Sequence, residues 1–153
     1  MRLHDRTFLL LGGTGGIGQA LISPLVESGA RVIVATRHPE RLEKRAGVSP
    51  VHLELASPEL DRQLQQLTEV YPDIDGVIHC AGQNRFAALE GMAVSDLDAQ
   101  LMVNLRSAML VARHFVPRFR KAGMGGLVFV GSTFGSIGFP GYTAYCASKH
   151  GLI

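Results

Sequence analysis

At 153 residues, with 46% hydrophobic and 18% charged residues, the chain is expected to form one globular domain, residues 1–153, with a buried core. Its net charge of +2 argues against a nucleic-acid partner, and no apolar run is long enough to span a membrane. The residues before the first strand resemble no signal peptide, and Cys80 and Cys146 form no disulfide or metal-binding pattern. We therefore expect a cytoplasmic protein with no membrane partner and no bound metal.

Strand and helix patterns alternate along the first half of the chain, which predicts βαβ units and a parallel sheet. Continuous apolar runs are typical of strands that are buried on both faces. In chain order, the sequence predicts a strand at Thr7–Leu11, a helix at Gly16–Ser28, a strand at Arg31–Thr36, a short helix at Pro39–Arg45 and a strand at Val51–Leu55.

The second half continues the alternation. Ser57 is a favourable N-cap and Pro58 a favourable first residue of a helix, and Pro117 can bend the long helix in which it lies. In chain order we predict a helix at Pro58–Val70, a strand at Gly76–Cys80, a helix at Ser95–Ala122, a strand at Gly126–Val130, a loop at Gly138–Gly141 and a last helix from Tyr142 that the chain end cuts short. The expected fold is α/β: a doubly wound, Rossmann-type parallel sheet that is incomplete after its fifth strand.

A glycine run lies between the first predicted strand and its helix. Gly12 would allow a tight turn, Gly16 would let the backbone approach a phosphate, and Gly18 would let the helix pack closely on the strand. An ordinary glycine-rich turn is the plain alternative. Because strand, motif and helix occur in the required order, dinucleotide binding is the favoured interpretation.

The end of the second predicted strand is where a dinucleotide-binding fold recognises the ribose. An acidic residue there would accept hydrogen bonds from the 2′-hydroxyl of NAD, but this chain has Thr36 and Arg37. Arginine can pair with a 2′-phosphate, so we favour NADP(H) over NAD(H). A solvated arginine at a helix start is the alternative interpretation.

Tyr145 and Lys149 are four residues apart, so they share one face of the last predicted helix. The lysine's positive charge can favour the tyrosinate and so suit the tyrosine to proton transfer. By themselves the two residues resemble an ordinary surface pair. Ser132 directly follows the fifth predicted strand, at the edge where ligands bind in open α/β sheets. Together with the glycine run, this serine favours a catalytic site over a surface pair.

These elements together resemble the N-terminal portion of a short-chain dehydrogenase/reductase. The family pattern has a glycine motif, an Asn-Ala-Gly-type element, a helix asparagine, a serine and a Tyr-x3-Lys pair. Here it is matched by Gly12, Gly16, Gly18, Ala81, Gly82, Asn104, Ser132, Tyr145 and Lys149. The match covers essentially the whole chain.

The resemblance implies an NADP-dependent oxidoreductase that interconverts a small-molecule carbonyl and an alcohol. Tyr145 would be the acid/base, Lys149 would favour the tyrosinate and bind the nicotinamide ribose, and Ser132 would orient the substrate oxygen. Asn104 would hold a water that relays protons to Lys149, and Glu54 would contact adenine. The implied cofactor-binding set is Gly12, Thr14, Gly15, Gly16, Ile17, Gly18, Arg37, Glu54, Leu55, Ala81, Gly82, Tyr145 and Lys149.

The chain also departs from the family pattern. Leu11 replaces the usual threonine before the glycine motif, and His79 and Cys80 replace the usual Asn-Asn; a packed strand histidine is the favoured interpretation of His79. The resemblance implies a homo-oligomer in full-length form. Family members continue beyond this length, so Leu127–Val130 would be an exposed apolar edge here, and we expect poor solubility or self-association for this chain alone. A non-catalytic nucleotide-binding module, or an inactive fragment, is the competing interpretation.

Overall fold

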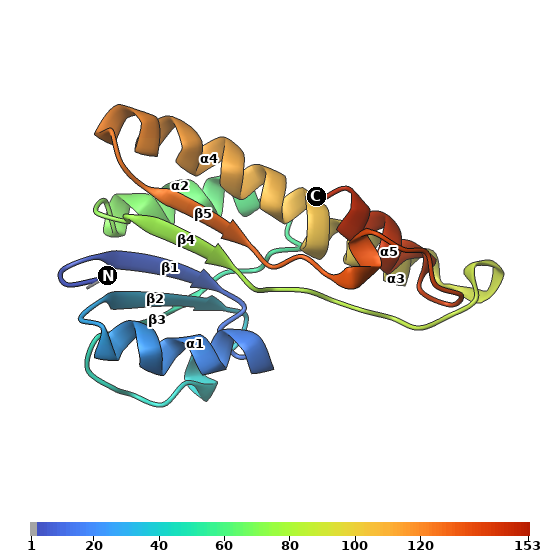
Figure 1. Ribbon diagram of the computed structural model, residues 1–153, viewed down its shortest axis with the longest axis horizontal. Helices are drawn as coiled ribbons and strands as arrows, with labels where there is room; N and C mark the ends of the chain where they lie inside the picture. The colour runs from blue at the N-terminus through green and yellow to red at the C-terminus, as the bar shows by residue number, and fades with distance from the viewer. Residues whose placement is uncertain (1–2) are drawn as a thin grey trace.

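A computed structural model describes residues 3–153 and shows one five-stranded sheet with helices on both faces (Figure 1). The strand order is β3-β2-β1-β4-β5, and all neighbouring strands are parallel. This is the predicted doubly wound arrangement. From β1 the chain adds β2 and β3 on one side of the sheet and then β4 and β5 on the other, so the order in which strands are added reverses between β1 and β4. The strands are β1 (Thr7–Leu11), β2 (Arg31–Thr36), β3 (Val48–His52), β4 (Gly76–His79) and β5 (Gly126–Phe129).

The helices cover the two faces of the sheet in two separate cores. Leu9 and Leu11 of β1 point to the face that α2 and α4 cover, where Phe115 is fully buried, whereas Leu10 points to the face that α1 covers. Side chains alternate between faces in this way because the strand repeats every two residues. The helices are α1 (Gly16–Glu27), α2 (Leu60–Val70), α3 (Val94–Leu101), α4 (Ser107–Ala122) and α5 (Thr143–His150).

The predicted strand at Val51–Leu55 was wrong in its bounds, because β3 begins and ends three residues earlier. It pairs with β2 in a register that joins Val32 to Val48 and Thr36 to His52. Pro50 argues against a strand in the sequence, but β3 is an edge strand, where a missing N–H is tolerated. As a result, Leu53 and Glu54 follow the strand instead of belonging to it.

Other boundaries also differ from the prediction. The helix expected at Pro39–Arg45 is only a 3₁₀ turn, η1 (Pro39–Arg41). The α2 helix begins at Leu60, because the Ser57 hydroxyl accepts a hydrogen bond from the Glu59 amide in a turn before the helix. The α5 helix spans Thr143–His150, and the Gly151 amide makes one more helical hydrogen bond to the Ala147 carbonyl.

The long helix predicted at Ser95–Ala122 contains an unexpected turn. A π-helical segment, η3 (Met102–Arg106), joins α3 to α4, whereas Pro117 lies inside the regular α4. A π turn inserts an extra residue and re-aims the side chains beside it, and such turns are frequent at functional sites. It leaves Asn104 and Ser107 fully buried against the carboxyl end of the sheet.

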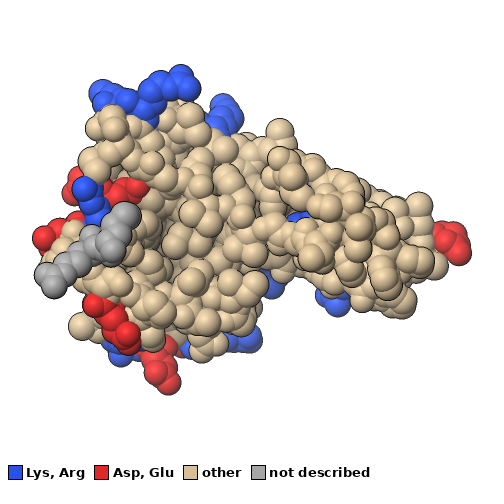
Figure 2. Space-filling view, in the orientation of Figure 1, with Lys and Arg blue, Asp and Glu red and all other residues tan. Residues whose placement is uncertain are grey.

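The carboxyl ends of β4 and β5 lead into a narrow extension that holds α3, α5 and the turns η2 (Leu89–Gly91) and η4 (Thr133–Gly135) (Figure 1). On the face shown in Figure 2, charged side chains gather on the body of the molecule, and the extension is nearly free of them until its acidic tip. Among the helices formed by residues 3–153, none has the length and apolar character needed to cross a membrane.

Candidate functional site

The glycine loop between β1 and α1 is packed as tightly as its sequence suggests. Gly12 has a φ of 85°, and a Cβ there would lie 2.6 Å from the Ala81 backbone nitrogen. A Cβ on Gly18 would lie 2.3 Å from the Gly12 carbonyl oxygen, whereas one on Gly16 would meet nothing within 4 Å. Two glycines are therefore required by the protein itself. Gly16, at the start of α1, leaves open space where the helix's free N–H groups can hold a phosphate.

A cavity of about 520 Å³ opens beside this loop, at the point where the strand order reverses. Its lining includes seven of the predicted cofactor-binding residues: Gly12, Thr14, Gly15, Arg37, Glu54, Leu55 and Gly82. The other predicted residues lie outside this lining. Gly16 and Ile17 are exposed at the start of α1, Gly18 and Ala81 support the loop, and Tyr145 and Lys149 lie on α5.

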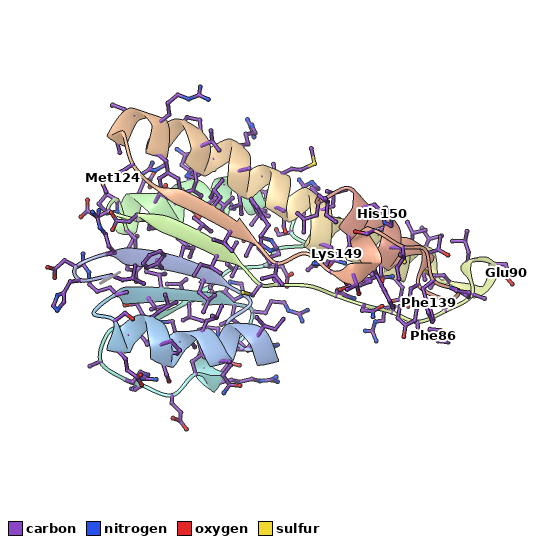
Figure 3. All side chains as sticks on the ribbon, viewed as in Figure 1. Phe86, Glu90, Met124, Phe139, Lys149 and His150 are labelled. Carbon is purple, nitrogen blue, oxygen red and sulfur yellow. The ribbon has the colours of Figure 1, made fainter. Side chains whose placement is uncertain are left out.

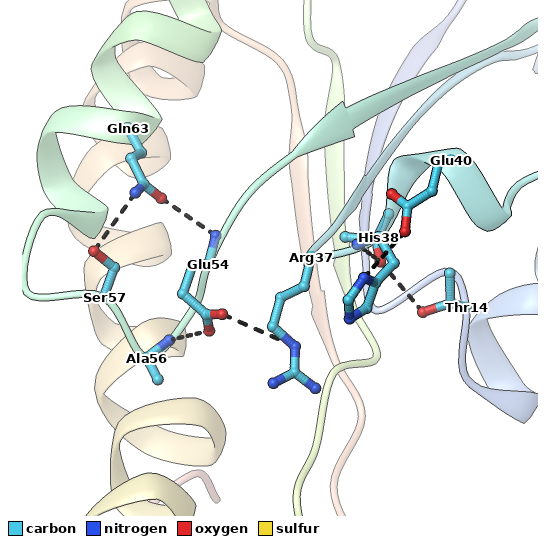
Figure 4. Close-up of polar contacts among 9 residues, drawn as sticks. Thr14, Arg37, His38, Glu40, Glu54, Ala56, Ser57 and Gln63 are labelled. Atoms are coloured by element: carbon cyan, nitrogen blue, oxygen red, sulfur yellow. Dashed lines mark hydrogen bonds and ion pairs between the residues drawn. The ribbon is translucent and has the colours of Figure 1, made fainter.

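The residues that follow β2 and β3 form one corner of this cavity (Figure 4). Arg37 lies there, with its Nε 3.9 Å from Glu54 Oε2. The Thr36 hydroxyl accepts a hydrogen bond from the His38 amide and lies 3.3 Å from the Thr14 hydroxyl, so the loop after β2 is tied to the glycine loop. The corner presents hydroxyls, an arginine and a carboxylate to the cavity.

Lys149 is the most buried charged group near the site. Its side chain is only 4% exposed, and its Nζ donates a hydrogen bond of 2.7 Å to the Val130 carbonyl at the end of β5. Nζ also lies 5.9 Å from the centre of the Tyr145 ring. A Cβ added to Gly82 would lie 3.9 Å from the same Nζ. Burial lowers the pKa of Lys149, while the neighbouring Cys80 acts in the opposite direction. The lysine side chain thus reaches from α5 to the carboxyl end of β5, close to Gly82 in the segment after β4 (Figure 3).

Ser132 follows β5 and caps the η4 turn, where its hydroxyl oxygen accepts a hydrogen bond of 3.2 Å from the Phe134 amide. The hydroxyl hydrogen has no partner among residues 3–153. It can therefore be donated to a substrate oxygen, as the implied role requires.

Asn104 joins three segments of the site through its side-chain amide. Its Oδ1 accepts from the Gln83 amide at 2.7 Å, and its Nδ2 donates to the Gln83 carbonyl at 2.8 Å and to the Ser148 hydroxyl at 3.0 Å. Both amide hydrogens are thus committed to protein partners, and one lone pair of Oδ1 is left. Ser148 in turn donates to the Tyr145 carbonyl at 2.7 Å, so Asn104 positions the helix that carries the tyrosine.

His79 is a packed strand residue, in agreement with the interpretation favoured from the sequence. It is 2% exposed, and its Nε2 lies 2.7 Å from the Ser107 hydroxyl, which donates its own hydrogen to the Val103 carbonyl. The serine must therefore accept from His79, so Nε2 carries the ring hydrogen. Burial lowers the pKa of His79 to about 4, and the positive charge of Lys149 adds to this effect.

Aromatic side chains surround Tyr145 in the extension. Phe134 lies 6.1 Å from Tyr145, stacks on Phe139 at 5.3 Å and meets Tyr142 edge-on at 5.1 Å, each distance measured between ring centres. Phe86 packs on Tyr142 from the segment after β4, and both Phe86 and Phe139 are exposed (Figure 3). The wall beside the tyrosine is therefore apolar.

Three buried polar residues at the carboxyl edge of the sheet were not predicted from the sequence: Gln100, Ser107 and Ser148. Gln100 accepts from the Arg85 amide at 3.0 Å, one helical turn before Asn104 anchors Gln83. The available signal was a run of polar residues at positions 100, 104 and 107 of a helix whose other inward positions are apolar.

The arrangement combines a tightly packed glycine loop and the Arg37–Glu54 corner with a serine, a tyrosine and a buried lysine at one edge of one sheet. No group of three or more His, Cys, Asp or Glu side chains between residues 3 and 153 is placed to hold a metal ion. The groups that are present suit proton transfer and stabilisation of charge on an oxygen.

Comparison with known proteins agrees with this geometry. Residues 6–153 match the family model described as short chain dehydrogenase. An uncharacterised oxidoreductase of Mycobacterium tuberculosis is 34% identical over 97% of this chain, which corresponds to 58% of the relative. The chain thus spans little more than half the length of this curated relative.

Solved structures show the same fold. A gluconate 5-dehydrogenase from Burkholderia cenocepacia, in complex with NADP and tartrate, superposes with a TM-score of 0.86 and 25% identity over 99% of this chain and 63% of its own. A 4-hydroxyisoleucine dehydrogenase complexed with NADH has a TM-score of 0.88 and 22% identity over 97% of this chain and 63% of its own. From the family match over residues 6–153 and the site described above, this chain belongs to the short-chain dehydrogenase family.

Proposed function

We propose that the protein containing this chain is an NADP-dependent oxidoreductase that interconverts a small-molecule carbonyl and an alcohol. The observation that carries the proposal is the position of Lys149. Its Nζ reaches the carboxyl end of β5, lies beside the Tyr145 ring and borders Gly82, so the tyrosine–lysine pair adjoins the dinucleotide cavity.

The residues present fit a nicotinamide dinucleotide. The open space at Gly16, the N-terminus of α1 and the loop at Thr14 and Gly15 suit the pyrophosphate. Arg37 suits a 2′-phosphate, and Glu54 and Leu55 suit the adenosine end. The cofactor, when bound, supplies or takes up the hydride.

The protein's own part in the reaction is to hold the substrate oxygen and move its proton. Tyr145 donates a proton to that oxygen during reduction and accepts it during oxidation. Lys149 favours the tyrosinate through its positive charge. Ser132 donates its unpartnered hydroxyl hydrogen to the developing oxyanion. Asn104 fixes α5 through Ser148, and a water at its remaining Oδ1 lone pair would serve the proton relay.

The aromatic side chains near Tyr145 bear on the substrate class. The aromatic wall of Phe134, Phe139 and Tyr142 favours a substrate with an apolar portion next to its carbonyl. We further propose a cytoplasmic homo-oligomer in which residues 1–153 form part of a single dinucleotide-binding domain.

The test is Tyr145→Phe, with Tyr71→Phe, at the end of α2 and outside the site, as the control. NADPH consumption is measured with a panel of aliphatic and aromatic ketones and aldehydes, and NADPH binding is measured by calorimetry. We expect Tyr145→Phe to lose roughly 10²- to 10⁴-fold in kcat with unchanged NADPH binding, because only proton transfer is removed. Tyr71→Phe should stay close to wild type.

Equal activity of Tyr145→Phe and the wild type would refute the assigned role. NADPH binding without turnover of any carbonyl in the panel would instead favour the non-catalytic nucleotide-binding module.

A further inference from the structure

We propose that Glu54 is a specificity residue of the cofactor site. Its carboxylate weakens the binding of a 2′-phosphate at Arg37 and so keeps the site open to NADH as well as NADPH. The inference rests on the proposed function, because it concerns which form of the cofactor that same site accepts. The β2 strand does not end in an acidic residue. Glu54, two residues after the neighbouring strand β3, places a carboxylate at the same corner.

Strand pairing brings the two charges together. Thr36 of β2 is paired with His52 of β3, and the Leu53 amide extends the ladder by donating to the Thr36 carbonyl at 3.0 Å. Arg37 and Glu54 therefore leave the sheet side by side. Both line the cavity of about 520 Å³, and Glu54 Oε2 lies 3.9 Å from Arg37 Nε.

Glu54 is held more firmly than Arg37. Its Oε1 accepts from the Ala56 amide at 3.2 Å, and its own amide donates to Gln63 Oε1 at 3.3 Å, so Oε2 is left facing the arginine (Figure 4). The Arg37 side chain is 65% exposed and has no hydrogen-bond partner among residues 3–153. Its Nε edge faces Glu54, while its two Nη groups remain available to an anion.

The sign of the effect follows from the charges. A largely solvated ion pair at 3.9 Å contributes little to holding the Arg37 side chain in place. Removing Glu54 should therefore change the conformation of Arg37 little. A phosphomonoester carries a charge of about −1.5 to −2. If the 2′-phosphate binds the two Nη groups of Arg37, only the guanidinium would separate the phosphate from the Glu54 carboxylate. Coulomb repulsion in a water-like medium then weakens its binding roughly threefold to tenfold. A 2′-hydroxyl has no such penalty, because it is neutral and can donate to a carboxylate.

The experiment measures the Kd of NADPH and of NADH by calorimetry for the wild type, Glu54→Gln, Arg37→Gln and Glu59→Gln. Glu59 is the matched control, because it is an exposed acid paired with Arg62 at the start of α2. We expect Glu54→Gln to bind NADPH roughly threefold to tenfold more tightly, with NADH unchanged or weaker. Arg37→Gln should weaken NADPH alone, and Glu59→Gln should change neither. The gain from Glu54→Gln should shrink as salt is added.

The outcomes separate this inference from the proposed function. If the wild type binds neither nucleotide, the proposed function fails and the inference fails with it. If both nucleotides bind but Glu54→Gln leaves NADPH binding unchanged or weakens it, only the inference is overturned. Glu54→Ala removes the same charge without adding an amide, so it must move NADPH binding in the same direction, and thermal melting of each variant verifies that it is folded.

Discussion

The two ends of the site are built in opposite ways. At the proposed adenosine end, Arg37 is exposed and Glu54 is half-buried, and the two lie 3.9 Å apart on short loops. At the proton-transfer end, Asn104 and Lys149 are buried and hydrogen-bonded at 2.7 to 3.0 Å to protein partners.

The difference shows which parts of the site can change independently of the fold. Exposed ion pairs contribute little to stability, so a corner made of them can be altered to select another cofactor. Buried polar groups are costly when they lose a partner, so the tyrosine–lysine edge is tied to the stability of the whole sheet. Four predictions test this contrast, from the largest expected effect to the smallest.

Asn104→Leu should produce the largest loss of stability, about 4 kcal/mol, because it leaves the Gln83 amide and carbonyl without a partner and removes the hydrogen bond that the Ser148 hydroxyl accepts. Asn84→Leu, the same change at an exposed position one residue after Gln83, is the control and should cost little. Urea unfolding measures both. Similar losses for the two variants would show that the buried amide network does not stabilise this edge.

His79 should make stability depend on pH. Its folded pKa of about 4 lies below its ordinary value of 6.5, so between these values the unfolded chain binds a proton that the folded chain does not. Stability should therefore be complete above pH 6.5 and should fall by about 3 kcal/mol as the pH drops to 4.

The measurement is the difference in unfolding free energy between the wild type and His79→Gln across this pH range. The exposed His52→Gln serves as the control and should keep the wild-type slope. A His79→Gln protein with the full wild-type slope would contradict the prediction.

Gly18→Ala and Gly16→Ala separate the space that the fold needs from the space that a ligand needs. Gly18→Ala should cost about 2 kcal/mol, because its Cβ would overlap the Gly12 carbonyl. Gly16→Ala should be neutral or slightly stabilising, since its Cβ meets nothing and alanine favours a helix. Thermal melting measures stability, and calorimetry with NADPH should show that Gly16→Ala binds more weakly. Unchanged NADPH binding would show that the cofactor does not approach Gly16.

Removing the exposed charges should have the smallest effect. Arg37→Gln and Glu54→Gln should each change the unfolding free energy by less than about 0.5 kcal/mol, because the pair is distant and solvated. Urea unfolding of each single variant is the measurement. A loss above about 1 kcal/mol from either would mean that this corner is as structural as the Asn104 network.

The sequence alone predicted much of the fold correctly. β1 and β2 match their predicted bounds, and the doubly wound sheet and the family are confirmed. These elements were predictable because continuous apolar runs and glycine spacing are local signals. The assigned roles of Ser132, Tyr145 and Lys149 stay predictions, which Tyr145→Phe begins to test.

The bounds of β3 and the π turn at Asn104 could not be predicted in the same way. Pro50 lowers the strand signal of Val48–His52, and only pairing with β2 shows that the edge tolerates it. The π turn has no signature in composition. The residue expected to disturb this helix was Pro117, which lies inside the regular α4.

The sequence by itself determined which residues could form the site, because residue type, spacing and hydrophobic pattern are properties of the chain. Only the tertiary structure decided what those residues meet: Asn104 on the Gln83 backbone, Lys149 on the Val130 carbonyl, and Glu54 beside Arg37. These contacts join residues that are 17 to 21 positions apart in the chain. Strand pairing and helix packing set them, and both depend on a partner element that lies elsewhere in the chain.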